Sequence, residues 1–503
     1  HLLVLALHHI VADGWSAAVF GRELAALHAA VAAGLPSPLP ELPLQYSDFA
    51  SWQRGWLAGE AFAEHLAWWR QNLAGAPARL ELPADRPRPA VPSWRGARVS
   101  LRVPPVQEAE LRRLARRTGV TLFMTLLAAF DVLLSRWTGE QDLVVGAPVA
   151  NRERLELEGL IGCFVNVLPL RIDLSHLAPP GIDDLLARVR QVSLDAFAHQ
   201  DLPFEKLVAA LAPRRSQATT PLFQVVLVLQ TARTPARGAA ALDPDSQAGL
   251  AVEICDLDLP VTTCKFDLAL AAAETPGGLE LAFDYSRDLF DAATIKRLAV
   301  RCQVLLAALA GLGGGLRCAV AELPWLSAAE RQHLLEGSGA AARTLPPGGT
   351  GAPSAGNGPP ARARSGNAPG LSADASEQER LCYIRAAPAI EIIQSSMTSR
   401  EQSRRTFKLS QSRHELLAAR LRRQASADAG EARIARRRGG EPLPLSFGQQ
   451  RLWFVAQLAP ESSAYNQAAL FLLQGRLDAA AMAAAFAAIL RRHEVLRSTL
   501  VAV

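Results

Sequence analysis

The stretch that most constrains the fold is HHIVADG (residues 8–14), which directly follows the largely apolar run HLLVLAL. An apolar run of this length is typical of a strand that is buried on both faces. Because side chains alternate across a strand, His8 and His9 are expected to point to opposite faces if the strand continues through them. One histidine would then face a cavity, and the other would pack into the scaffold.

The residues after this motif have the pattern of a helix. Asp13 and Gly14 interrupt the strand, and Ser16 is a suitable N-cap for an apolar face made of Phe20, Leu24, Leu27 and Val31. A histidine at a strand end, next to a turn carboxylate and a helix N-terminus, is suited to general acid–base chemistry. The alternative is that the motif holds two half-buried histidines and a turn aspartate with no chemical role.

The charge of the chain is unevenly distributed. The net charge is +5, but residues 397–440 contain twelve Lys/Arg and only four Asp/Glu, so the rest of the chain carries −3. We interpret residues 397–440 as a solvated basic linker, and we expect no nucleic-acid partner. The length of 503 residues is enough for roughly three domains.

Several observations predict a cytoplasmic protein. No segment reaches the ~18 uncharged apolar residues of a membrane span, so we expect no membrane partner. No basic segment precedes HLLVLAL, as it would in a signal peptide. The six cysteines form no CxxC pair and are interpreted as buried thiols rather than as disulfides or zinc ligands. No His/Cys/Asp cluster has ligand spacing, and no metal site is predicted.

Helical and strand patterns alternate between residues 46 and 311. The aromatic residues Tyr46, Phe49, Trp52 and Trp56 recur at helical spacing and are interpreted as packing residues. The segments LAVEICDLDL, KFDLALAAAE and GLELAFDYS are expected to be strands of one antiparallel sheet. Helices interleaved with such a sheet predict the α/β class and a two-layer sandwich.

The segment 331–444 is expected to be a largely disordered linker with one short helix at 409–423, because residues 337–370 are rich in Gly and Pro. Residues 445–503 again have the pattern of a folded region, with an Ala-rich helix before RRHEVLR.

Seven segments, in order, resemble the condensation domain of nonribosomal peptide synthetases. They are HHIVADGWS (8–16), YSDFASWQR (46–54), GAPVANR (146–152), IGCFVNVLPLR (161–171), HQDLPFEKLV (199–208), PLFQ (221–224) and KFDL (265–268). The pattern HHxxxDG alone is shared by many CoA-dependent acyltransferases, whereas all seven segments in this order are specific.

The resemblance implies a fold of two lobes, each similar to chloramphenicol acetyltransferase, that form a V with the histidine motif at their junction. Residues 1–97 would be the C-terminal part of an incomplete first lobe, and residues 98–330 the second lobe. Residues 445–503 contain LSFGQQRLWF and RRHEVLR, which resemble the opening segments of the family. We therefore expect 445–503 to begin a second condensation domain and not to fold back onto the first lobe.

Met397 starts a stretch that resembles the N-terminus of a new synthetase subunit. The chain is accordingly interpreted as the end of one reading frame joined to the beginning of the next. On that interpretation, the chain as it stands would be poorly soluble and inactive.

The resemblance implies amide-bond formation between two aminoacyl or peptidyl thioesters. Each would be delivered on the phosphopantetheine arm of a donor or acceptor peptidyl carrier domain, with no cofactor bound directly. An adjacent adenylation domain is a further expected partner.

By its position in the motif, His9 would be the catalytic residue that positions or deprotonates the acceptor amine, and His8 would be structural. Asp13 is expected to form a salt bridge with Arg171. Gly14 would leave room where the substrate arm approaches the backbone.

Trp15 and Asn166 are candidates either for the substrate channel or for packing. Three other functions remain open: an epimerisation domain of the same fold, a CoA-dependent acyltransferase, and an inactive scaffold fragment. KFDL and HQDLPFE favour condensation over epimerisation. The pair Arg215-Ser216 stands where the family usually has Arg-Asp before PLFQ, and we expect this change to lower stability rather than to alter the reaction.

Overall fold

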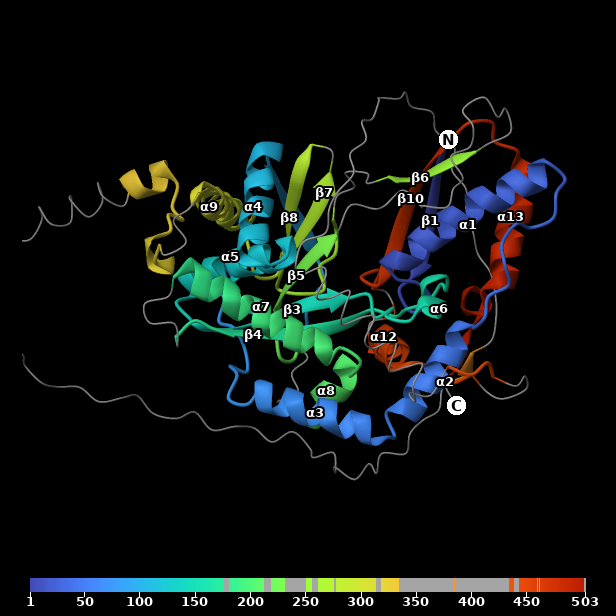
Figure 1. Cartoon of the computed structure of the whole chain (residues 1–503), viewed down its shortest axis with the longest axis horizontal. Helices are drawn as coiled ribbons and strands as arrows, with labels where there is room; N and C mark the ends of the chain where they lie inside the picture. Colours follow the sequence, from blue (N-terminus) through green and yellow to red (C-terminus); the bar gives the residue numbers. More distant parts are fainter. Residues whose placement is uncertain are drawn as a thin grey trace, which may run out of the picture.

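The chain forms two lobes, each with its own sheet, that lie side by side (Figure 1). The computed structural model describes residues 1–175, 181–211, 219–230, 250–255, 261–275, 277–313, 318–333, 383–384, 434–437, 443–458, 460 and 462–501. The predicted helix at 409–423 and the pair Arg215-Ser216 lie outside these residues.

The larger lobe contains a six-stranded sheet with the strand order β2-β8-β7-β5-β3-β4. Its strands are β2 (Gly96–Val103), β3 (Asp142–Val149), β4 (Asn166–Asp173), β5 (Val225–Gln230), β7 (Leu268–Thr275) and β8 (Gly278–Ser286). Strand β5 runs parallel to both β3 and β7, while the other pairs are antiparallel. The predicted antiparallel sheet is therefore a mixed sheet, because β5 returns to the sheet through crossover connections.

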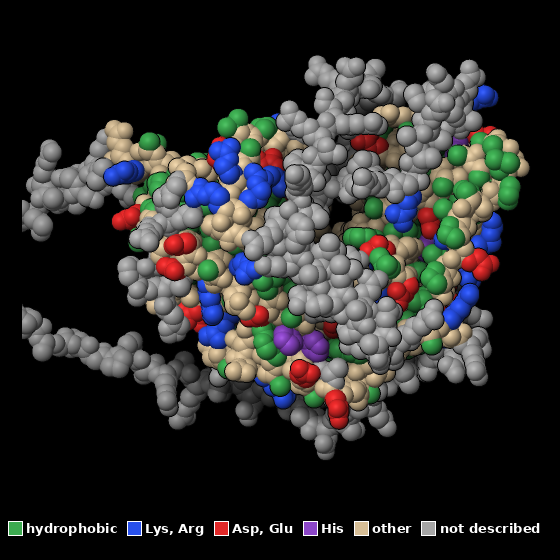
Figure 2. Space-filling view, in the orientation of Figure 1, with side chains coloured by type: hydrophobic (Ala, Val, Ile, Leu, Met, Phe, Trp, Pro, Cys, Tyr) green, Lys and Arg blue, Asp and Glu red, His purple; other side chains and the backbone are tan. Residues whose placement is uncertain are grey.

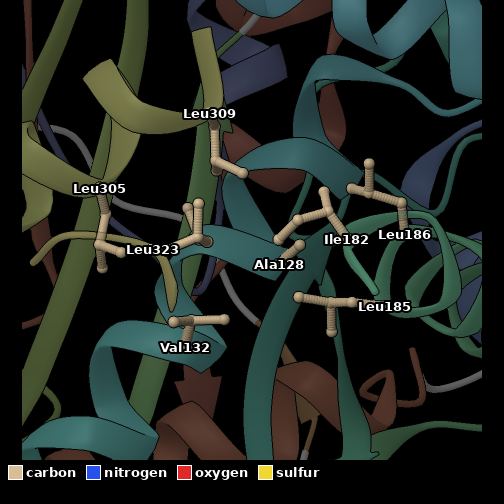
Figure 3. A pocket seen from close by; sticks show the side chains of 9 residues that line it. Ala128, Val132, Ile182, Leu185, Leu186, Leu305, Leu309 and Leu323 are labelled. Carbon is tan, nitrogen blue, oxygen red and sulfur yellow. The ribbon is translucent and has the colours of Figure 1, made fainter. Parts of the chain in front are cut away.

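The helices that pack around this sheet include α4 (Pro105–Thr118), α5 (Leu122–Thr138), α7 (Ile182–Ala198) and α9 (Ala292–Gly311) (Figure 1). Helices α4 and α5 end before Gly119 and Gly139, whose φ angles of 70° and 81° lie in the left-handed region. Figure 3 shows where α5, α7 and α9 meet in the core, around a small apolar gap lined by Ala128, Val132, Ile182, Leu185, Leu186, Leu305, Leu309 and Leu323.

The smaller lobe contains a three-stranded antiparallel sheet with the order β1-β10-β6. Its strands are β1 (Leu2–His8), β10 (Asn466–Gln474) and β6 (Ala251–Cys255). Helices α1 (Gly14–Ala32) and α13 (Ala479–Arg492) pack on it, and the Phe20 ring contacts the rings of Phe471 and Phe486 at centroid distances of 5.8 and 5.4 Å. This lobe is thus assembled from three distant parts of the chain.

The expectation that residues 445–503 do not fold back onto the first lobe is wrong. All seven residues of β1 pair with β10, so the apolar HLLVLAL strand is covered by the C-terminal region. The burial of this strand and of Phe471, which is 0% exposed, removes apolar surface from water.

The lobes are also not separated at residue 97 as predicted, because each lobe contains residues from both sides of this position. Strand β6, which lies within 98–330, belongs to the smaller sheet and not to the sheet of β7 and β8 as predicted. Conversely, Trp69 and Leu73 precede residue 97 but pack in the core of the larger lobe.

The start of α1 differs from the prediction by three residues. Asp13 is the N-cap, and Ser16 is the third helical residue of a capping box in which each side chain bonds the other's backbone. Phe20, Leu24 and Leu27 are buried as predicted, but Val31 is 38% exposed because it lies near the end of the helix.

The remaining elements are α2 (Tyr46–Trp56), α3 (Glu60–Asn72), α6 (Leu155–Glu158), α8 (Phe204–Leu211), α12 (Phe447–Leu458), β9 (Tyr383–Ile384), β11 (Leu500–Val501) and the 3₁₀ turns η1 (Val320–Glu322) and η2 (Glu494–Arg497). The aromatic face of α2 packs as predicted: Tyr46 and Phe49 are buried, and each contacts the Phe164 ring.

On the face shown in Figure 2, Lys and Arg side chains gather over α4, whose Arg113, Arg116 and Arg117 are exposed. No single helix among the described residues has both the length and the apolar character of a membrane span; α4 and α5 meet those criteria only when taken together, across a 101° bend. In the described part of the chain, Cys163, Cys264 and Cys302 are buried free thiols, and Cys318 is a half-buried one.

Candidate active site

His9 lies in the turn that follows β1, at the junction of the two lobes. Its backbone N–H donates to the Tyr465 carbonyl at 2.7 Å, and its ring Nδ1 lies 2.9 Å from the Ala12 carbonyl. Because a carbonyl oxygen can only accept, Nδ1 carries the proton of the neutral ring. The Nε2 atom is therefore left with a lone pair that can accept a hydrogen bond.

The surroundings of His9 favour its neutral form. Burial, and secondly the positive charge of Lys265, lower the pKa of His9 from 6.5 to about 4. The Cys163 sulfur lies 3.8 Å from His9 Nδ1, and burial raises the pKa of this thiol to about 12. At neutral pH, His9 is thus an uncharged imidazole beside an uncharged thiol.

His8 is the last residue of β1, and its Nδ1 accepts a hydrogen bond from the Ile10 backbone N–H at 3.2 Å. The strand ends before His9, so strand alternation does not separate the two rings as the sequence predicts. The bond to Ala12 sets the orientation of the His9 ring instead.

The predicted salt bridge between Asp13 and Arg171 is wrong. Asp13 pairs with Arg152, whose Nη2 lies 3.1 and 3.2 Å from the two carboxylate oxygens, and both side chains are at most 1% exposed. Arg171 instead pairs with Asp142 on the neighbouring strand β3, at 2.8 Å.

The buried Asp13 carboxylate is fully engaged. Besides Arg152, it accepts from the Ser16 N–H at 2.9 Å, the Ser16 hydroxyl at 2.7 Å and the Phe164 N–H at 3.1 Å. Arg152 in turn donates from Nη1 to the carbonyls of Leu157 and Leu160, at 2.7 Å each. This network ties the turn after His9 to residues 152–164 and holds it in one conformation.

The other predicted site residues have different surroundings. Gly14 is exposed, and a Cβ atom built on it would meet no protein atom within 4 Å. Trp15 is 42% exposed, and its indole N–H donates to the Glu158 carbonyl at 2.9 Å. Asn166 is buried, and its amide group donates to the carbonyls of Gln200 and Leu202 at 2.8 Å each. Asn166 therefore anchors the HQDLPFE segment through its side chain.

The structure adds three residues that the sequence prediction missed around His9: Tyr465, Gln449 and Lys265. Gln449, near the start of α12, donates to the Ile10 carbonyl at 3.1 Å, and Lys265 lies over the Tyr465 ring with Nζ 4.6 Å from the centroid. Gln449 and Lys265 stand within segments that support the family resemblance, LSFGQQRLWF and KFDL. That membership was the available signal, but only the tertiary structure places them beside His9.

No group of three or more His, Cys, Asp or Glu side chains that could hold a metal ion occurs in the described part of the chain. The site consists of the His9 ring, bound to the Ala12 carbonyl, and the buried Asp13–Arg152 pair.

The fold and the strand–turn–helix histidine motif define a condensation domain. The chain belongs to this family, whose sequence profile, described as "Condensation domain", matches residues 1–335 and 441–502. Its lobes have the α/β, chloramphenicol acetyltransferase-like fold predicted from the sequence.

Among similar proteins, one component of the linear gramicidin synthase of Brevibacillus parabrevis is 48% identical over 308 residues, which are 61% of this chain and 4% of that protein. Phosphinothricin tripeptide synthetase PhsC of Streptomyces viridochromogenes is 42% identical over 337 residues, or 67% of this chain and 30% of that protein. The chain thus spans a small part of the curated relatives it matches.

Solved structures that are similar to the chain include the following two. The first is described as the complex of the X-domain and OxyB from teicoplanin biosynthesis; it has a TM-score of 0.54 and 32% identity over 64% of this chain and 69% of that one. The SgcC5 protein of Streptomyces globisporus has a TM-score of 0.51 and 25% identity over 60% of this chain and 68% of that one.

Proposed function

We propose that the chain forms an amide bond between two carrier-bound thioesters in nonribosomal peptide biosynthesis. The observation that carries this proposal is the neutral His9 ring, held through Nδ1 by the Ala12 carbonyl and with Nε2 available at the junction of the two lobes. Family membership and the similarity to peptide synthetases support it.

In this reaction, the nitrogen of the acceptor amine attacks the carbonyl carbon of the donor thioester. The new C–N bond gives a tetrahedral intermediate, and its collapse breaks the C–S bond. The amine loses a proton, and the leaving sulfur takes one up and departs as a thiol. His9 Nε2 accepts a hydrogen bond from the amine, orients its lone pair towards the carbonyl, and relays the proton to sulfur.

The lowered pKa of His9 favours a role as hydrogen-bond acceptor for the amine over a role as a general base that keeps the amine proton. A base that holds a proton through the reaction works best with a pKa near the working pH, whereas that of His9 is about 4. His9 therefore acts mainly by positioning the amine, and its proton transfer is transient. The Asp13–Arg152 pair contributes indirectly, by holding the turn that carries His9.

The proposed partners follow from the same chemistry. The donor and acceptor groups arrive on the phosphopantetheine arms of separate peptidyl carrier domains, which are substrates of the chain and not resident cofactors. An adenylation domain that loads the acceptor carrier completes the proposed set.

The test uses purified chain with one donor and one acceptor carrier domain, each loaded with an aminoacyl thioester, and follows the peptidyl product by mass spectrometry. The wild type should form product, the His9→Ala variant should form none, and both should have the same circular dichroism spectrum. The matched control is His8→Ala, which should retain turnover but melt at a lower temperature. Equal product formation by the wild type and His9→Ala would refute the assignment of His9.

Two further reactions in the same assay distinguish the alternatives. If an acyl-CoA donor replaces the donor carrier without loss of rate, the chain is a CoA-dependent acyltransferase. If a carrier-bound aminoacyl group changes its configuration without amide formation, the chain is an epimerisation domain. Condensation predicts product only when both loaded carriers are present.

A further inference from the structure

Three distant parts of the chain meet at His9. Lys265 precedes β7 of the larger sheet, Tyr465 precedes β10 of the smaller sheet, and His9 follows β1. The antiparallel register pairs His8 with Asn466, so Tyr465 comes opposite His9 and accepts its backbone N–H at 2.7 Å. Lys265 Nζ lies 4.6 Å from the centroid of the Tyr465 ring. Tyr465 thus contacts His9 through its backbone and Lys265 through its ring.

The Lys265 ammonium is half-buried and makes no ion pair with the described carboxylates. Arg451, a second cation that acts on Lys265, pairs with the Glu205 carboxylate at 3.1 Å. Burial, and secondly the charge of Arg451, lower the pKa of Lys265 to about 8. A cation over an aromatic face is stabilised by the ring, so the Lys265 ammonium is held by a cation–π interaction with Tyr465.

The charged groups that act on His9 oppose one another. Lys265 disfavours the imidazolium form, whereas the Asp13 carboxylate favours it. Asp13 is already neutralised by Arg152, and the Cys163 thiol is uncharged because burial raises its pKa to about 12. Lys265 is therefore the cation whose effect on His9 is not cancelled by a carboxylate partner among the described residues.

We propose that Lys265 is a positioning residue of the condensation site, whose ammonium, docked on the Tyr465 ring, joins the two lobes beside His9 and adds to burial in opposing protonation of the imidazole. The consequence for turnover rests on the function proposed above, whereas the charge state of His9 does not. The contact also makes His9 sensitive to how the lobes meet, because Lys265 belongs to the larger lobe and Tyr465 to the smaller one.

The first test measures the protonation of His9 without any substrate. The full chain is labelled with [¹³Cε1]histidine, the His9 signal is assigned from its loss in His9→Ala, and the wild type and variants are titrated by NMR. In Lys265→Met, which keeps an unbranched apolar side chain but removes the charge, the His9 midpoint should move to higher pH by about half a pH unit or more. Lys265→Arg should restore the wild-type midpoint.

Two substitutions at Tyr465 test the docking. Tyr465→Leu keeps the carbonyl that binds His9 but removes the ring, so it should also move the midpoint upwards; Tyr465→Phe keeps the ring and should not. An unchanged His9 midpoint in both Lys265→Met and Tyr465→Leu would overturn the proposal. If Lys265→Met fails to fold, Lys265→Gln and Tyr465→Leu decide the question in its place.

The second test is the pH profile of kcat/KM for amide formation. Activity requires neutral His9, so the acid limb of the Lys265→Met profile should move to higher pH, with Lys265→Arg restoring it. A purely structural role would lower the rate by the same factor at every pH, and this result would contradict the proposal. A wild type that forms no amide bond would refute the proposed function, while the NMR titration would still decide the role of Lys265.

Discussion

At the scale of single residues, Arg152 and Arg171 differ in how deeply their ion pairs are buried. Arg152 is buried and neutralises Asp13, whereas Arg171 forms a partly exposed pair with Asp142, in which the side chains are 19% and 27% exposed. Loss of a partner from a buried ion pair leaves an uncompensated charge, but loss of an exposed pair has little effect.

We therefore predict that Arg152→Met lowers the free energy of unfolding by about 3–5 kcal/mol, and that Arg171→Met lowers it by about 1 kcal/mol. Urea denaturation of both variants, followed by tryptophan fluorescence, measures the difference. Equal destabilisation by the two substitutions would show that the buried Asp13–Arg152 pair contributes no more to stability than the Arg171–Asp142 pair.

The environment of Asp131 predicts how the stability of the fold depends on pH. It lies on α5 in the core of the larger lobe, is 0% exposed, and its carboxyl oxygens have no hydrogen-bond partner in the described structure. Burial raises the pKa of Asp131 well above 3.8. Above pH 3.8 the unfolded chain loses this proton while the folded chain keeps it, so unfolding becomes more favourable as the pH rises.

The isosteric variant Asp131→Asn cannot ionise and should remove this pH dependence. We expect the variant to gain stability over the wild type between pH 4 and pH 8, by about 1–3 kcal/mol at pH 8. Thermal unfolding of both proteins at several pH values tests this. A melting-temperature difference that stays constant with pH would contradict the raised pKa.

At the scale of elements, one close approach joins α1 to β10. Gly21 of α1 lies against the Phe471 ring, and a Cβ atom added there would come within 2.8 Å of it. Gly55 of α2 is also helical, but an added Cβ would meet nothing within 4 Å. The two glycines therefore form a matched pair for the effect of one methyl group.

We predict that Gly55→Ala raises the free energy of unfolding by about 1 kcal/mol, because alanine favours the helix. Gly21→Ala should instead lower it by about 1–3 kcal/mol, because overpacking pushes α1 away from β10. Chemical denaturation of the two variants measures both effects. A stabilising Gly21→Ala would mean that β10 does not pack on α1.

At the scale of the whole molecule, the smaller lobe depends on contacts between residues at opposite ends of the chain. Beyond the β1–β10 pairing, Glu23 of α1 bonds Arg492 at 2.9 Å and His493 at 2.8 Å, and the Tyr46 hydroxyl lies 2.7 Å from that of Ser446. These contacts are numerous and buried, so the two parts should hold together without the covalent connection between them.

This can be tested by inserting a protease recognition sequence between residues 350 and 351 and cleaving the purified chain. The two pieces should elute together from a sizing column under native conditions and separate in denaturant. As a control, Glu23→Ala, which removes the partner of Arg492 and His493, should weaken the association. Separate elution of the wild-type pieces under native conditions would contradict the β1–β10 pairing.

The sequence by itself determined what depends on local pattern. The strand before HHIVADG, the helix after it and the packing face of α2 follow from spacings of two to four residues. The family follows from the order of seven short segments, which the matching profile confirms. Local periodicity and order along the chain are properties that a sequence contains directly.

The tertiary structure alone decided which distant groups meet. Residue spacing does not reveal that Asp13 pairs with Arg152 and not Arg171, that β6 joins β10 and not β7, or that Lys265 and Tyr465 lie beside His9. The sequence also led to a wrong expectation for the C-terminal region, because the need of an apolar strand for a partner does not specify which part of the chain supplies it. Burial, charge pairing and sheet register are set by distances in space, and these are fixed only when the whole chain has packed.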